Sequence, residues 1–120
     1  MIQLEIEFEV YKRRIKNPKP YLVDNSKNYI SFIFIFNDGI WIDVDKYIIF
    51  KYKNKKLIKY LGSDCICEID VPNEIMKEDF IKFKIQGKID DEEVILTKSL
   101  VIPMEKSGFT EKVFTYSGEN

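Results

Sequence analysis

The 120-residue chain contains no histidine. Histidine is the usual general base near neutral pH and the commonest transition-metal ligand, so its absence excludes Ser-His and Cys-His nucleophiles. Glycine is also scarce, with five residues, and the sequence has no phosphate-binding loop, dinucleotide-binding fingerprint or nucleophile elbow. We therefore expect a protein that is not an enzyme, has no catalytic residues and needs no cofactor.

The sequence also lacks a large net charge of either sign and long apolar runs. Lysine plus arginine (19) balance aspartate plus glutamate (20), which leaves no field that would steer the protein toward nucleic acid or anionic lipid. Apolar runs such as 30–36 are much shorter than the roughly 20 residues of a membrane helix. The acidic N-terminus does not resemble a secretory signal. The sequence predicts no nucleic-acid partner, no membrane partner and no export signal.

Cysteine is limited to Cys65 and Cys67. Two residues that are two apart in a strand point to the same face, and they cannot easily form a disulfide with each other. We interpret both as reduced, buried small residues.

The residues that are present are typical of one small all-β domain. Hydrophobic residues make up 45% and charged residues 32% of the chain, which suits a single core with a polar surface. Apolar residues at every second position from Ile2 to Val10 predict a half-buried strand. The β-branched and aromatic segment 28–36 predicts a central strand. The spacing of the remaining predicted strands favours a sandwich or barrel; these strands are 47–53, 57–61, 65–71, 80–86 and 94–102.

The connections between these strands carry turn and loop signals. The basic segment 12–20 contains two prolines and predicts a meandering loop. A solvated turn at 87–93 should join its two flanking strands as an antiparallel hairpin. One short helical turn is expected near 72–77. We expect a sandwich over 1–104 and a C-terminal tail or arm over 105–120.

Acidic residues around the single tryptophan are the nearest approach to a chemical site. Asp38, Asp43 and Asp45 surround Trp41 and could in principle form an acid–base pair or hold calcium. Their spacing matches no calcium loop, so we interpret them as turn-forming residues and predict no metal site. Trp41 is interpreted as a core residue. The two basic runs, within 12–19 and 51–59, are interpreted as solvated edges.

The strand 28–36 is apolar on both faces. Its second face carries Tyr29, Ile33 and Ile35, and in a two-layer sandwich that face would meet water. Another subunit or the chain's own loops could cover this apolar face. We predict partner binding through these residues together with aromatic residues of the C-terminal arm, namely Phe109, Phe114 and Tyr116.

A resemblance to a known family follows from the order of several motifs. These are the run 24–30 followed by Phe32, Phe34, Trp41 and Phe50; the segment 65–72; the hairpin 80–102 with Gly87 and Thr97; and 107–109. The pattern resembles the N-terminal immunoglobulin-like domain of phage baseplate upper proteins from Gram-positive hosts. The resemblance implies an immunoglobulin-like antiparallel β-sandwich of about seven to eight strands. It also implies a virion protein of the tail or baseplate, made in the bacterial host cytoplasm, whose partners are other tail or baseplate proteins or copies of itself.

Two alternatives remain at the level of sequence. Seven tyrosines and several acidic loops would suit a carbohydrate-binding module that recognises a host surface glycan. A small inhibitor that binds one host protein has the same composition.

Overall fold

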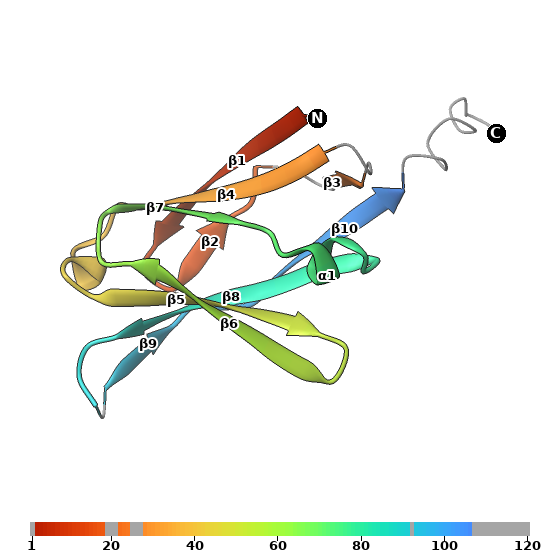
Figure 1. Cartoon of the computed structure of the whole chain (residues 1–120). Coiled ribbons are helices and arrows are strands. Elements are labelled where there is room, and N and C mark those ends of the chain that lie inside the picture. The colour runs from red at the N-terminus through yellow and green to blue at the C-terminus, as the bar shows by residue number, and fades with distance from the viewer. Residues whose placement is uncertain (1, 19–21, 25–27, 92, 107–120) are drawn as a thin grey trace.

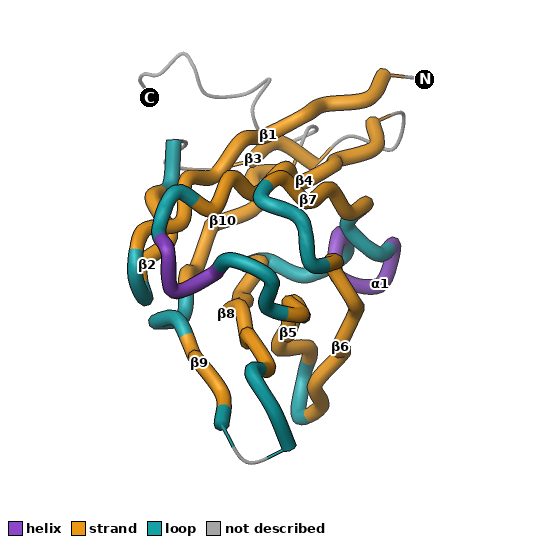
Figure 2. The backbone as a smooth tube through the Cα atoms, turned by 90° about the vertical axis from the view of Figure 1, so that its left-hand side faces the viewer, coloured by secondary structure: helices purple, strands orange, loops and turns teal. Residues whose placement is uncertain are grey.

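A computed structural model describes residues 2–18, 22–24, 28–91 and 93–106 of the chain. These residues form two β-sheets stacked as layers, with β1, β4 and β7 in one layer and β5, β6 and β8 in the other (Figures 1 and 2). The predicted all-β sandwich is confirmed. The strands are β1 (Ile2–Tyr11), β2 (Arg14–Lys16), β3 (Leu22–Asp24), β4 (Asn28–Phe36), β5 (Asp45–Tyr52), β6 (Lys55–Gly62), β7 (Ile66–Asp70), β8 (Phe80–Lys88), β9 (Val94–Leu96) and β10 (Leu100–Lys106).

Two short helices complete the described elements. The helix α1 (Asn73–Met76) lies where a short helical turn was expected, after Pro72. A 3-10 turn, η1 (Gly39–Trp41), was not predicted. Neither helix in the described part of the chain has the length and apolar character that a membrane crossing needs.

The first sheet has four strands in the order β2-β1-β4-β7. The segment predicted as a meandering loop instead begins with a tight hairpin, because Lys12 adopts a positive φ of 54° and lets β2 pair with β1. β2 reverses the chain direction and pairs with the last three residues of β1, Glu9 to Tyr11. After β3, which belongs to the other sheet, β4 runs parallel to β1, with Ile6 opposite Phe32. The expectation of purely antiparallel sheets is wrong for this pair and for β3 with β10.

The second sheet has six strands, with the order β3-β10-β8-β5-β6 and with β9 also paired to β8. The predicted antiparallel hairpin around 87–93 is confirmed, since Gln86 lies opposite Leu96. The strand predicted at 94–102 is interrupted at Thr97, whose Oγ1 accepts from the Ile85 N–H at 2.9 Å and whose own N–H donates to the Ile85 carbonyl at 3.0 Å. This interruption and the unexpected β2 and β3 bring the described strands to ten, compared with the expected seven to eight.

A cluster of phenylalanines fills the space between the sheets. Phe8, Phe32 and Phe34 come from the first sheet and meet Phe83 of β8, with ring centroids 5.2–5.8 Å from it. All four are at most 1% exposed. Edge-on and tilted ring pairs of this kind combine large apolar burial with favourable ring geometry. The period-two pattern therefore identified the inward faces of β1 and β4 correctly.

Trp41 is a core residue, as predicted, with 1% of its surface exposed. Its Nε1 donates to the Lys12 carbonyl at 2.7 Å, and its ring lies 5.2 Å from that of Phe36. The indole also packs against Gly87, where no side chain intervenes. Trp41 thus contacts the β1–β2 hairpin, β4 of the first sheet and β8 of the second sheet.

The two cysteines are free thiols but do not share one environment. Cys67 is buried on β7, and desolvation by burial raises the pKa of its thiol. Cys65 is exposed, so the prediction of two buried cysteines is wrong for this residue. The reason is that β7 begins at Ile66, and Cys65 belongs to the preceding bend, where alternation between faces does not apply.

Candidate partner-binding surface

The outward face of the four-stranded sheet contains the three residues predicted to bind a partner on β4. Tyr29 is 50% exposed, and Ile33 and Ile35 are half-buried. The inward face of the same strand holds the phenylalanines of the core. The other predicted partner-binding residues, Phe109, Phe114 and Tyr116, lie outside the described residues, and strand β10 extends into the predicted arm as far as Lys106.

Acidic side chains border this apolar strip on both sides. Ile33 lies between Glu7 of β1 and Glu68 of β7, all in one cross-strand row. The next row places Ile35 between a glutamate and Ile66, which is 63% exposed. We call this surface the acidic face. It consists of Glu5, Glu7, Glu9, Glu68 and Asp70 around Tyr29, Ile33, Ile35 and Ile66.

Two polar residues modify the acidic face. Ser31 is fully buried, and its hydroxyl donates to Asp70 Oδ1 at 2.6 Å, which fixes one carboxylate. Lys16 of β2 is paired in register with Glu9 at one edge. An apolar centre with a mostly acidic border is complementary to a partner that has an apolar centre and a basic border.

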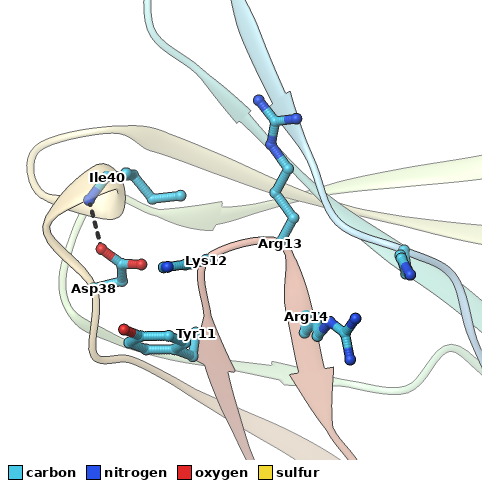
Figure 3. Close-up of a pocket in the computed structure, with 7 residues that line it drawn as sticks. Tyr11, Lys12, Arg13, Arg14, Asp38 and Ile40 are labelled. Atoms are coloured by element: carbon cyan, nitrogen blue, oxygen red, sulfur yellow. Dashed lines mark hydrogen bonds between the residues drawn. The ribbon is translucent and has the colours of Figure 1, made fainter.

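A second candidate site is a cavity of about 570 Å³ between the β1–β2 hairpin and η1. It is lined by Tyr11, Lys12, Arg13, Arg14, Asp38, Ile40 and Lys98. In Figure 3, the side chains of Tyr11 and Lys12 point from the hairpin toward Asp38, whereas that of Arg13 points away. The hairpin is held in place because the Lys98 N–H donates to the Arg13 carbonyl at 2.9 Å.

The charges of this cavity favour an anionic group. Four cationic side chains line it against the single carboxylate of Asp38. Oδ1 of Asp38 accepts from the Ile40 N–H at 3.2 Å, while Oδ2 is buried and has no hydrogen-bond partner in the described part of the chain. The basic run at 12–14 was interpreted as a solvated edge, and its side chains are exposed, but they also border a cavity. The sequence signal was the run of charges; the hairpin that gathers them was not predicted.

The aspartates near Trp41 have local roles. Asp38 caps η1, and Asp45 accepts from the Tyr60 hydroxyl at 3.0 Å, a hydrogen bond that raises the pKa of Tyr60. Asp43 occupies a turn with φ of 56°. Within the described ranges, no three Cys, Asp or Glu side chains gather as metal ligands would. Asp38 and Asp43 agree with their interpretation as turn-forming residues, whereas Asp45 is the first residue of β5 and does not.

Comparison with known proteins supports the fold. No protein-family model matches the sequence, and no curated protein matches it. Among solved structures, the chain is similar to the N-terminal domain of phage TP901-1 ORF48, with a TM-score of 0.54 and 9% sequence identity. The alignment covers 88% of this chain and 100% of that one. The chain therefore has the fold of a domain that occurs in a phage protein.

Proposed function

We propose that this chain is a non-catalytic structural or attachment module of a phage tail or baseplate, located in the virion and acting through contacts with other tail proteins. The observation that carries this proposal is the acidic face, an outward sheet surface with an apolar strip in its centre. The fold shared with the phage ORF48 domain supports the same context.

The composition of the acidic face is unusual for a solvated sheet. The outward side of an antiparallel or mixed sheet normally alternates polar residues with the buried row. Here Tyr29 and Ile66 remain half or more exposed, with two further isoleucines between them. Removing apolar surface from water stabilises a complex by about 25 cal/mol per Å². A protein–protein contact on this face would gain that energy without any chemical step.

Tail particles purified from the strain that encodes the chain provide the test. Mass spectrometry should detect the chain in the particles in a fixed ratio to other tail proteins. The double variant Ile33→Lys/Ile35→Lys should fold but be absent from the particles, because two ammonium groups cannot be buried in the contact.

The matched control introduces the same charges elsewhere. Ile42 and Ile89 are 60% and 48% exposed and lie outside the acidic face. The variant Ile42→Lys/Ile89→Lys should enter the particles like the wild type. Absence of the wild-type chain from the particles, or normal incorporation of the Ile33→Lys/Ile35→Lys variant, would contradict the proposed function.

A further inference from the structure

The outward face of the six-stranded sheet carries a row of three like charges. Lys51 of β5 lies directly opposite Lys56 of β6 on one side and Lys82 of β8 on the other. All three side chains are exposed. Like charges placed directly opposite each other destabilise a sheet, so this row has an electrostatic cost within the isolated chain.

None of these lysines has a compensating partner within the described residues. The side chains of the row and of Lys84, which lies one row away opposite Ile49, form no hydrogen bond or ion pair there. Together they border a small cavity of about 150 Å³ that also includes Ser99. Among the residues that the structure describes, no carboxylate therefore competes with an external anionic surface for the four ammonium groups.

Apolar side chains adjoin the lysines on the same face. Ile49 and Ile58 face each other across β5 and β6, and Ile58 is 54% exposed. Val101 of β10 lies beside Lys82 at the end of the lysine row. We call this surface the basic face. It consists of Lys51, Lys56, Lys82 and Lys84 with Ile49, Ile58 and Val101.

The basic face and the acidic face lie on the two opposite sides of the sandwich, because each is the outward side of a different sheet (Figure 2). The formal charge of the whole chain is only −1, so positive and negative residues are nearly equal in number. On these two faces they are separated in space. Copies of the chain therefore do not repel each other strongly as whole molecules.

We propose that the basic face of one copy docks on the acidic face of a second copy. This inference rests on the proposed function, since it names a partner for the acidic face. Each surface has isoleucines at its centre, and the charges around them are opposite: Ile33 lies between two glutamates, whereas Ile49 adjoins the lysine row. Complementary charges around an apolar centre favour docking in one register and oppose self-pairing of either face.

The two docking surfaces are different patches of the same chain, so the contact is heterologous. Each docked pair leaves one acidic face and one basic face free. Repetition then closes into a ring or continues as an open stack, depending on the rotation between successive copies.

Analytical ultracentrifugation of the full chain tests the proposal. At low salt the wild type should form species heavier than a monomer, and these should dissociate as salt rises, because salt screens the charges at the borders of the contact. The variants Lys51→Glu/Lys82→Glu and Glu7→Lys/Glu68→Lys should each be monomeric. The first variant places two carboxylates on the basic face beside Lys56 and Lys84. The second places two lysines on the acidic face beside the three remaining carboxylates, so each variant reverses two charges of one face and leaves the other face unchanged.

A mixture of the two variants gives the decisive measurement of this experiment. The mixture should recover heavy species, because every contact between unlike variants again joins opposite charges. Circular dichroism checks that each variant is folded. If a double variant fails to fold, the single substitution Lys56→Glu on the edge strand β6 replaces the first variant, and the heavy fraction should then fall without disappearing.

Three results would overturn the inference. The first is a wild type that stays monomeric at every salt concentration up to about 1 mM protein, the weak limit of specific association. The second is a mixture that remains monomeric. The third is a monomer whose lysines bind polyphosphate, which would assign the basic face to an anionic polymer. A monomeric chain that is nevertheless present in tail particles would refute the stacking alone and leave the proposed function intact.

Discussion

Adding one methyl group at Gly87 should destabilise the fold measurably. A Cβ at this position would lie 2.7 Å from Cζ3 of Trp41 and 2.8 Å from Cγ1 of Val44. Ordinary carbon–carbon contacts are about 3.5–4.0 Å, so both neighbours would have to retreat by roughly an ångström.

Neither neighbour can retreat easily. Trp41 and Val44 are both buried, and the indole is fixed by its hydrogen bond to the Lys12 carbonyl. Overpacking of a well-packed core costs about 1–3 kcal/mol. The lower conformational entropy of alanine in the unfolded chain offsets about 0.4–1 kcal/mol of this. We therefore expect Gly87→Ala to lower the free energy of unfolding by about 1–2 kcal/mol.

Urea unfolding followed by the fluorescence of Trp41, the sole tryptophan, measures this difference. Gly39→Ala is the matched control, because a Cβ at Gly39 would meet nothing within 4 Å. That variant should lie within about 0.5 kcal/mol of the wild type. Equal stabilities for Gly87→Ala and the wild type would refute the packing of the indole against β8.

Further expectations concern a buried hydroxyl and the two thiols. Thr97→Val removes the acceptor of the buried Ile85 N–H and should cost about 1–3 kcal/mol in urea unfolding. Thr97→Ser keeps the acceptor and should retain most of the stability; equal loss in both variants would contradict this. At neutral pH, iodoacetamide should label Cys65 quickly and Cys67 slowly, as followed by mass spectrometry, because only Cys67 is buried and has a raised thiol pKa. A pKa raised by folding stabilises the fold below the pKa of the unfolded thiol, and this contribution is lost as pH rises through the folded value. Urea midpoints should therefore fall more between pH 8 and 10 for the wild type than for Cys67→Ala, and equal falls would contradict the assignment.

The period-two patterns predicted most of the fold because they depend on local sequence. Alternation along β1 and the two apolar faces of β4 are visible in neighbouring residues, and so is the short turn after Pro72. The β1–β2 hairpin was not predictable in the same way. Its loop residues, Lys12 and Arg13, carry no turn signal, and the positive φ of Lys12 is maintained by tertiary contacts with Trp41 and Lys98.

Burial of Lys46 illustrates the same limit. A lysine in a strand is ordinarily solvent-facing, yet this residue is fully buried. Its Nζ donates to the carbonyls of Val44, Ser63 and Asp64 at 3.0–3.1 Å and lies 4.9 Å from the Phe36 ring centroid. Two of these acceptors, Ser63 and Asp64, come from a bend after β6, so local sequence could not reveal them.

The sequence likewise predicted only part of the candidate surfaces. The apolar outward side of β4 was predicted from the sequence, because Tyr29, Ile33 and Ile35 are alternate residues of one strand. The acidic border and the lysine row depend on which strands are neighbours, and Glu68 and Lys82 enter them from distant parts of the chain. Pairing and register therefore supplied what the pattern of single strands could not.

Photocrosslinking within assembled tail particles tests the central claim most directly. A benzophenone side chain at position 33 should crosslink to another subunit, whereas the same group at position 42 should not. Crosslinks from position 33 that join only residues of the same chain, or intersubunit crosslinks of equal yield from both positions, would contradict the account that this protein works by contact through its acidic face.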